Sequence, residues 1–343
     1  MHIIFFLLKN NKKYSLLKKK RIGVISLENS NNIGNNLVKF AMFIKLKELN
    51  FDPIIIALTI YKNIYFVKNQ MKLIEINKSY DELNETDFDY LIVNSDQTWS
   101  NNNPKYFLDY GFLKFSENWN IPKLVYGASY PFDKWLYSKT LTQKMTLLLK
   151  KMKAISVREL PTINFAKKYL NATTEFVLDP TLLIDKKYYL DLIKNYNGNF
   201  DSNKSYLCVY QLDKNKNIRK FIYKSASKLK LSIYNVNLEN ENYIEDFLKC
   251  INISKAVITD SYHGTVFSII FEKPFISFIN KGRGNTRFYT LRYIFNAKNR
   301  IISKNVNTKN KIKYLKYQYI INKDMFEKLK NRSLLFLKKN LQI

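Results

Sequence analysis

Short apolar segments alternate with longer amphipathic ones along the first half of the chain, as strands and helices do in a parallel α/β sheet. The segment 21–27 (RIGVISL) is rich in aliphatic residues, and it is followed by a helical spacing of apolar residues over 37–49. Further strands are predicted at 53–58, 90–93, 124–128, 154–157 and 176–178, with a helix around 134–151. We therefore predict one Rossmann-like domain over residues 1–193.

A polar segment at 194–204 (KNYNGNFDSNK) interrupts this alternation and is predicted to be a linker. Strands are then predicted at 205–210, 231–236, 256–259 and 274–279, and helices at 218–229, 243–253 and 265–271. This predicts a second Rossmann-like domain over 205–310 and a helical tail over 311–343, with an amphipathic helix at 324–341. Two such domains would face each other across a cleft, where ligands usually bind.

The composition supports folded domains and adds a strong positive charge. Of the 343 residues, 46% are apolar, and 57 Lys and Arg against 28 Asp and Glu give a net charge of +29. Only 8 of the basic residues are Arg, the side chain favoured for reading phosphates and bases, so we expect no nucleic-acid partner. A basic face of the C-terminal helix could instead contact an anionic membrane; the alternative is that this helix docks on its own domain.

Cysteine and histidine are scarce. The two cysteines exclude a disulfide framework and favour a reducing compartment, and together with two histidines they are too few for a structural zinc site, so no metal is predicted. The apolar run at 3–8 is too short to span a bilayer and lacks the flanking features of a signal peptide. We therefore expect a cytoplasmic location.

The most informative segment is 257–278, where a buried strand ends at Asp260 and Ser261, and His263 and Gly264 open a helix. Strand ends of this kind bind ligands, and a helix start at Gly264 and Thr265 supplies N–H groups for an anion. The imidazole of His263 could bind an anion or transfer a proton. The alternative is a plain helix cap with a packed histidine.

Other strand ends carry further candidate residues. Arg158 follows the strand at 154–157 and could hold a carboxylate or phosphate, or could simply pair with Glu159 at the surface. Asp96 and Gln97 follow the strand at 90–93 and suit sugar hydroxyls; the alternative is a capping turn.

Two polar loops complete the set of candidates. The run 281–287 (KGRGNTR) carries Arg283 and Arg287 and is expected to be a mobile, anion-contacting loop. The loop at 29–36 holds Asn32 and Asn35 but has no P-loop or dinucleotide signature.

An ordered set of motifs resembles the polysaccharide pyruvyl transferase family. The motifs are NxGN at 32–35, SDQTW at 95–99, YGAS at 126–129, SVRE at 156–159, LDPTLL at 178–183 and TDSYHGTVFSIIFEKPF at 259–275. The resemblance implies a two-domain, glycosyltransferase-B-like fold and transfer of a pyruvyl group from phosphoenolpyruvate onto sugar hydroxyls as a ketal. It departs from the family pattern at Asn94, where glycine is common, and at Ser261–Tyr262, where some members have a basic residue.

The resemblance also suggests roles. His263 resembles the histidine at the phosphoenolpyruvate site, with Asp260 orienting it or acting as a base. Arg158 resembles the arginine that holds the anion, and Arg283 or Arg287 would add charge. Asp96 and Gln97 resemble acceptor-side residues. The expected partners are phosphoenolpyruvate, as donor substrate and not as a cofactor, and a glycan or lipid-linked saccharide.

Two other functions stay open at this level. One is a nucleotide-sugar glycosyltransferase of the same architecture, because a fold alone does not determine a function. The other is a non-catalytic protein that binds anionic ligands through its net charge of +29.

Overall fold

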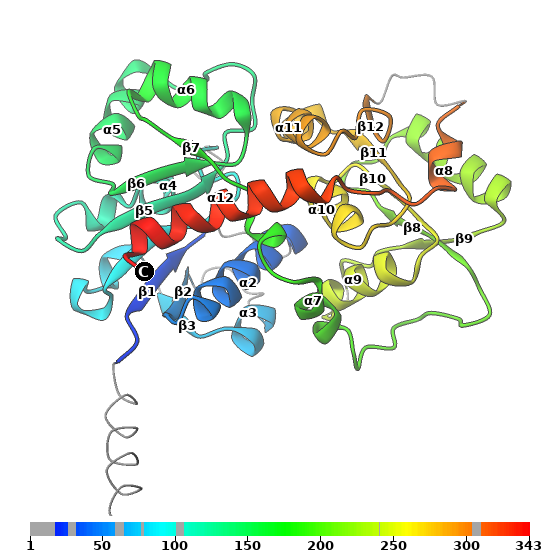
Figure 1. The fold of residues 1–343 in the computed structure, drawn as a ribbon, viewed down its shortest axis with the longest axis horizontal. Coiled ribbons are helices and arrows are strands. Elements are labelled where there is room, and N and C mark those ends of the chain that lie inside the picture. The colour runs from blue at the N-terminus through cyan, green and yellow to red at the C-terminus, as the bar shows by residue number, and fades with distance from the viewer. Residues whose placement is uncertain are drawn as a thin grey trace, which may run out of the picture.

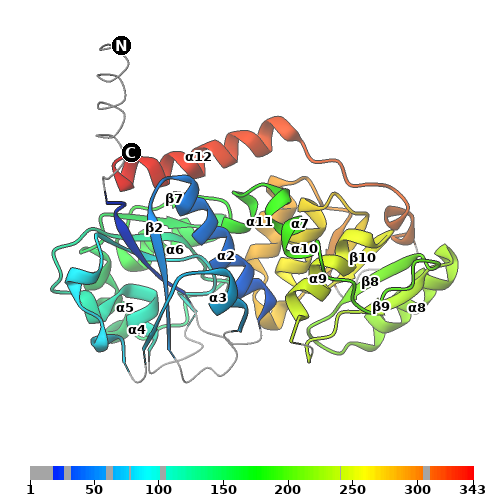
Figure 2. The ribbon, with the colours of Figure 1, turned by 90° about the horizontal axis from the view of Figure 1, so that it is seen from below.

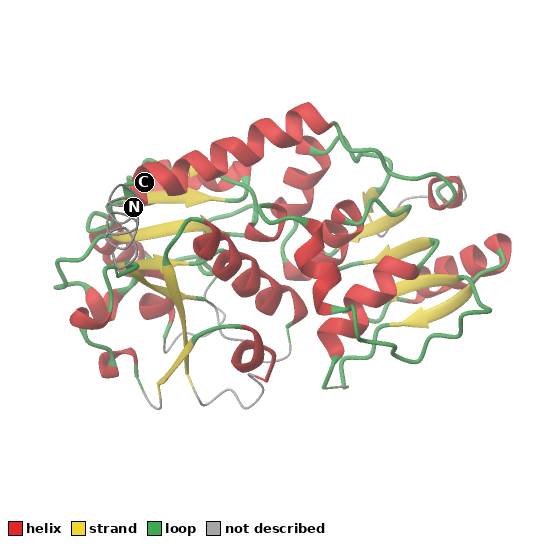
Figure 3. Ribbon diagram, turned by 60° about the horizontal axis from the view of Figure 1, so that its bottom comes forward, coloured by secondary structure: helices red, strands yellow, loops and turns green. Residues whose placement is uncertain are grey.

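The computed structural model describes residues 18–26, 32–58, 65–76, 79–100, 106–239, 241–303 and 310–343. Within these residues the strands form two separate parallel sheets, each flanked by helices (Figures 1 and 3). The apolar run at 3–8 and residues 29–31 of the polar loop lie outside the described residues. None of the described helices combines the length and the apolar character that are needed to cross a bilayer.

The first sheet has the strand order β3-β2-β1-β4-β5-β6-β7. Its strands are β1 (Arg21–Ile25), β2 (Asp52–Leu58), β3 (Leu73–Ile76), β4 (Tyr90–Val93), β5 (Lys123–Ala128), β6 (Ala154–Val157) and β7 (Glu175–Phe176). Its helices are α2 (Ile33–Glu48), α3 (Tyr65–Gln70), α4 (Phe107–Phe112), α5 (Lys139–Leu149) and α6 (Leu160–Leu170), whereas α7 (Lys186–Leu192) packs against the helices of the second sheet. Successive residues of a strand point to opposite faces of the sheet, and each face is covered by helices. In β4, Ile92 belongs to the apolar core that contains α2, and Leu91 belongs to the core that contains α4 and α5.

The second sheet has the order β12-β11-β10-β8-β9. Its elements are β8 (Tyr206–Tyr210), α8 (Lys216–Leu229), β9 (Ser232–Asn235), α9 (Tyr243–Ile253), β10 (Ala256–Thr259), α10 (Tyr262–Ile270), β11 (Phe275–Ile279), α11 (Thr286–Ile294) and β12 (Ile301–Ser303). The two sheets with their helices confirm the predicted α/β class.

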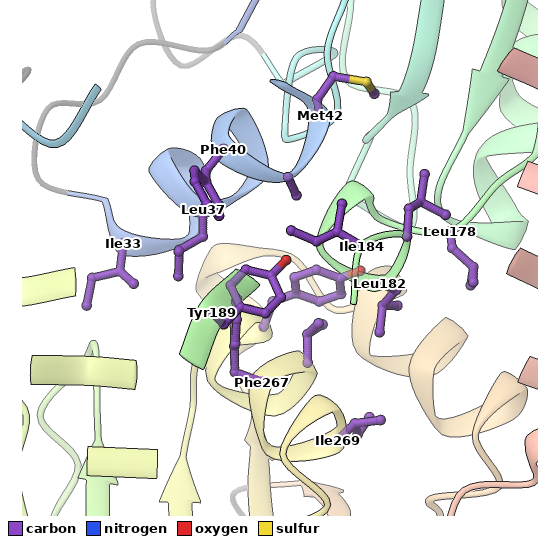
Figure 4. Close-up of a cluster of buried hydrophobic side chains, with 14 of the residues drawn as sticks. Ile33, Leu37, Phe40, Met42, Leu178, Leu182, Ile184, Tyr189, Phe267 and Ile269 are labelled. Atoms are coloured by element: carbon purple, nitrogen blue, oxygen red, sulfur yellow. The ribbon is translucent and has the colours of Figure 1, made fainter. Parts of the chain in front are cut away.

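One apolar core joins the two halves. Figure 4 shows side chains of α2, of the 178–189 segment and of α10 directed toward one another. The ring of Tyr189 contacts Phe267 of α10, with centroids 4.9 Å apart, and faces Phe40 of α2 at 6.3 Å. The two halves are therefore packed against each other and not connected by the 194–204 segment alone.

The C-terminal helix α12 (Lys323–Leu341) returns across the first half of the molecule (Figure 2). Its Phe336 is buried against Tyr126, and its Ser333 hydroxyl accepts a hydrogen bond from the backbone N–H of Leu178 at 2.9 Å. In the structure this helix is docked on its own protein, the alternative to a membrane-contacting helix.

Three expectations need correction. Cys208 of β8 and Cys250 of α9 form a disulfide, which is no framework but is also not what a reducing compartment predicts. The helix expected over 134–151 begins only at residue 139, where the Ser138 hydroxyl caps it. The run 281–287 is no free loop, because a Cβ on Gly284 would lie 2.2 Å from the Cβ of Pro131 and residue 286 already begins α11.

Candidate active site

Acidic and basic side chains gather where the strands of the first sheet end. Asp96 follows β4, Arg158 follows β6, and Asp179 lies three residues after β7. Parallel strands bring their carboxyl ends to the same edge of a sheet, which explains why residues far apart in the sequence meet here. The helices α2 and α10 contact each other between the two sheets, and their first turns lie next to this edge (Figure 1).

Arg158 is the centre of this cluster, and its side chain is fully buried. One terminal nitrogen, Nη1, donates to Asp179 Oδ2 at 2.5 Å and to Ser95 Oγ at 3.3 Å; Nη2 donates to Asp96 Oδ1 at 3.1 Å, and Nε to Glu159 Oε1 at 3.4 Å. The alternative prediction of an exposed Arg158–Glu159 pair is therefore wrong, because both side chains are buried. Arg158 holds three carboxylates in place, and its predicted contact with an anionic ligand stays a prediction.

The carboxylates differ in their ionisation. Burial alone would raise the pKa of Asp179, but Arg158 and His263 outweigh this effect and hold it well below its usual value. The pKa of Asp96 is lowered by the same two neighbours against the same burial. For Glu159 burial prevails over Arg158, and its pKa is raised. The site therefore contains two carboxylates that remain charged far below neutral pH.

The backbone at Asp96 is strained. Its φ of 137° is in a region that residues with a side chain rarely adopt, at a cost of about 1–3 kcal/mol. The backbone N–H of Ser129 donates to Asp96 O at 3.0 Å, while Asn35 Nδ2 and the Gln97 N–H donate to its carboxylate at 3.2 and 2.8 Å. Such strain is typical of functional sites, and here it directs the Asp96 carboxylate toward Arg158.

His263 lies at the second residue of α10 and is only 5% exposed. Its Nε2 is 3.7 Å from Asp179 Oδ2, beyond hydrogen-bond distance, and has no hydrogen-bond partner among the described residues. The other side of the ring contacts the backbone of α2, where a Cβ on Gly34 would lie 1.8 Å from Nδ1. The imidazole therefore occupies the space of the missing Gly34 side chain and depends on both halves of the molecule.

Tyr262 connects His263 to the two arginines of the site. Its buried ring lies 4.8 Å from Cζ of Arg158, 5.2 Å from Cζ of Arg287 and 5.0 Å from the centroid of the His263 ring. Burial raises the pKa of the Tyr262 hydroxyl far above its usual value, so the ring is a neutral support for these groups.

Asp260 does not orient His263. Its carboxylate accepts hydrogen bonds from the backbone N–H groups of Leu212 at 2.6 Å and Asp213 at 3.3 Å, and from Asn280 Nδ2 at 3.2 Å. These contacts join the ends of β8, β10 and β11. Asp179, from the first half, is the carboxylate beside the imidazole.

The helix start at 261–265 is built for packing. Ser261 caps α10 by accepting from the Gly264 N–H at 3.2 Å. A Cβ on Gly264 would lie 2.3 Å from Thr259 Oγ1, so this glycine allows helix–strand contact and not the predicted ligand approach. The buried Thr265 hydroxyl donates to Ser261 O at 2.8 Å and lies 2.6 Å from Ser277 Oγ, which accounts for it without a ligand.

The remaining predicted residues lie at the edge of the cluster. Gln97 Nε2 donates to the Arg283 carbonyl at 3.0 Å, across the two halves. The partly exposed Arg283 side chain donates to Asp213, with Nη2 to Oδ1 at 2.9 Å. Asn32 caps α2 by accepting from the Asn35 N–H at 3.1 Å. Asn35 thus reaches Asp96, whereas Asn32 shapes the helix start.

Sequence reasoning assigned no role to Asp179, Tyr262 or Gly34, although all three lie in quoted motifs. The signal for Asp179 was the same as for Asp96: an acidic residue just after a buried strand. The contact between Gly34 and His263 joins segments more than two hundred residues apart, and no local pattern could have indicated it.

Comparison with known families identifies the chain. The family model described as polysaccharide pyruvyl transferase matches residues 32–282, a range that contains the whole carboxylate–arginine–histidine cluster except Arg287. The chain belongs to this family. The resemblance of the motifs is thereby confirmed. No significant match was found among curated proteins.

Solved structures show that this family member has a glycosyltransferase-B-like fold. The UDP-GlcNAc 2-epimerase of Methanocaldococcus jannaschii is 13% identical, with a TM-score of 0.59 over 93% of this chain and 99% of that one. The Neisseria meningitidis UDP-GlcNAc 2-epimerase is 12% identical, with a TM-score of 0.57 over 93% and 100%. A glycosyltransferase from Rickettsia africae is 14% identical, with a TM-score of 0.52 over 95% and 98%. At such identities the likeness establishes the fold alone.

Proposed function

We propose that the protein transfers a pyruvyl group from phosphoenolpyruvate to two hydroxyls of a sugar, forming a ketal. The observation that carries this proposal is the buried imidazole of His263, whose Nε2 has no hydrogen-bond partner in the described part of the chain and lies beside the ionised Asp179. An imidazole held next to a carboxylate can carry a proton, and a proton donor is what the enol carbon of this donor requires.

The reaction balances without a further reactant. One sugar hydroxyl adds to C2 of phosphoenolpyruvate while C3 receives a proton and becomes a methyl group. The C2–O bond to phosphate then breaks, and the second hydroxyl forms the second C–O bond. Of the two hydroxyl protons, one replaces the proton given to C3 and the other leaves with inorganic phosphate.

The side chains divide these tasks. His263 protonates C3, and the Asp179 carboxylate lies beside the ring that gives the proton. Asp96 and Gln97 face the acceptor, where a carboxylate and an amide suit sugar hydroxyls. The start of α10 lies beside His263 and contributes a positive dipole end toward the anionic donor.

The acceptor in this proposal is a glycan or lipid-linked saccharide, a precursor of a surface polysaccharide such as a capsule. The protein would act in the cytoplasm, at the inner face of the membrane, where such a precursor is available; the single Cys208–Cys250 disulfide is the observation that speaks against this location. The net charge of +29 supports contact with anionic lipid.

Substitution of His263 tests the proposal. His263→Ala should lower phosphate release from phosphoenolpyruvate by about 10²- to 10⁴-fold, the usual effect of losing a general acid. It should also lower the melting temperature to some extent, because the buried ring fills space beside Gly34. In His263→Gln the amide still donates a hydrogen bond but carries no transferable proton, so activity should be lost almost as completely. Mass spectrometry of the glycan should detect the added pyruvyl group only with the wild-type protein.

Two results would contradict the proposal. If His263→Ala keeps nearly full turnover and mainly melts at lower temperature, His263 is structural. If the wild-type protein consumes UDP-sugars and not phosphoenolpyruvate, it is a glycosyltransferase, the alternative suggested by the likeness to solved structures such as the Rickettsia africae glycosyltransferase.

A further inference from the structure

Arg287 is a buried cation with almost no partners. It is the second residue of α11 and is 6% exposed. Its Nη2 donates to the Arg283 carbonyl at 2.9 Å, but its Nε has no acceptor among the described residues. No carboxylate in the described part of the chain lies within 4.0 Å of its guanidinium nitrogens.

This arrangement is costly in the absence of a ligand. Burial and the nearby charge of Arg158 outweigh the opposing effect of the more distant Asp96 and Glu159 and lower the pKa of Arg287 to about 10, so the group is still charged at neutral pH. A buried charge without an ion partner costs several kcal/mol of folding free energy. A bound anion would supply the missing partner.

Arg158 provides the internal comparison. Both guanidinium groups lie near the ring of Tyr262, at 4.8 and 5.2 Å, and both are buried. Arg158 donates to three carboxylates, which would repel an incoming anion, whereas Arg287 donates only to a carbonyl. His263, whose Nε2 is also without a partner, lies 5.0 Å from the same ring.

We propose that Arg287, and not Arg158, is the guanidinium that binds an anionic group of the donor, its phosphate or its carboxylate, while Arg158 positions Asp96 and Asp179. This inference rests on the proposed function. It adds a ligand-binding residue that lies outside the residues matched by the family model, 32–282. The start of α11, which no side chain caps, adds the positive end of the helix dipole at the same place.

Three variants of the full-length protein test the assignment: Arg287→Met, Arg158→Met, and Arg292→Met as a control on the same helix. Methionine keeps most of the apolar stem and removes the charge. Calorimetric titration with phosphoenolpyruvate should show affinity about 10- to 100-fold weaker for Arg287→Met, as expected for lost hydrogen bonds to a charged group, and unchanged affinity for Arg292→Met.

Thermal unfolding without ligand separates a binding role from a structural one. Arg287→Met should melt at the wild-type temperature or above, because it removes an unpaired buried charge. Arg158→Met should melt at a clearly lower temperature, because it leaves three buried carboxylates unpaired. Inorganic phosphate and pyruvate, used as competitors, identify the donor group that Arg287 binds. If it binds the phosphate, the Arg287→Met variant should lose more affinity for inorganic phosphate; if it binds the carboxylate, it should lose more affinity for pyruvate.

The failures are distinguishable. If Arg287→Met binds phosphoenolpyruvate within twofold of wild type, or melts as low as Arg158→Met, the Arg287 inference is overturned and the proposed function stands. If the wild-type protein does not bind phosphoenolpyruvate at all, the proposed function fails, and the assignment of Arg287 to this donor fails with it.

Discussion

At the scale of single residues, Gly34 lacks a side chain at a position where the ring of His263, distant in the sequence, packs against the backbone. Glycine inside a helix usually costs about 0.5–1 kcal/mol relative to alanine. Here the space of its missing side chain is filled by the His263 ring, since a Cβ would lie within 2.5 Å of three ring atoms. The steric cost of that overlap exceeds the gain in helix propensity. Replacing this glycine by alanine should therefore destabilise the protein, whereas the same replacement usually stabilises a helix.

Gly34→Ala is therefore expected to lower both the melting temperature and the turnover, since it displaces the imidazole from Asp179. In a His263→Ala background the overlap is gone, and the same substitution should instead stabilise the protein by about 0.5–1 kcal/mol. Chemical unfolding of the four proteins measures this cycle. Gly282→Ala is the control, because a Cβ there meets nothing closer than Asn280 Oδ1 at 3.7 Å. A stabilising Gly34→Ala in the wild-type background would contradict the packing argument.

The sequence predicts which reactive side chains lie at strand ends, but it does not predict which of them interact with one another. Asp96, Arg158 and His263 were recognised because each follows a buried strand, and the structure brings all three together. Asp260 follows a strand equally well, yet it binds backbone N–H groups of Leu212 and Asp213, just after the neighbouring strand β8. Which carboxylate meets His263 depends on how the two halves pack, and local sequence does not encode that.

At the scale of elements, segments with a clear hydrophobic pattern were predicted well and weakly patterned ones were missed. The strands β4 and β10 and the helix α9 have the predicted bounds, because short, fully buried runs define the two strands and a clear helical spacing defines α9. The elements without a prediction were α3, β3, α4, α7, α11 and β12. These are short or only partly apolar, so tertiary packing and not local propensity decides their conformation.

The docking of α12 leads to a prediction at this scale. Phe336 is 2% exposed and packs against Tyr126, whereas its neighbour Leu335 is 63% exposed. Phe336→Ala should lower the free energy of unfolding by about 3–5 kcal/mol, the usual cost of emptying a buried aromatic position. Leu335→Ala should change it by less than about 0.5 kcal/mol. Urea unfolding compares the two, and equal small effects would mean that α12 is not docked in solution.

At the scale of the whole molecule, the two halves share one core and one site. Apolar side chains of α2, α7 and α10 form a single cluster, and the polar cluster takes Asp179 and Arg158 from one half and His263 and Arg287 from the other. The site is thus complete only when the halves are packed together. Sequence patterns predicted two α/β units, but the shared core required the three-dimensional structure.

The net charge of +29 leads to a last prediction, which concerns the membrane. Phe336, Leu337 and Leu341 of α12 are buried, so lipid contact of this helix would depend mainly on its exposed charges. Arg332 and Lys339 lie on one such face, seven residues apart. Each basic residue near an anionic surface contributes about 1 kcal/mol, so Arg332→Gln with Lys339→Gln should weaken binding to phosphatidylserine vesicles about 30-fold at low salt. Lys220→Gln with Lys224→Gln, an equal charge change on exposed positions of α8, is the matched control. Vesicle flotation at two salt concentrations measures both variants. Equal losses would indicate attraction by the overall charge, whereas a selective loss in the first variant identifies α12 as the face toward the lipid.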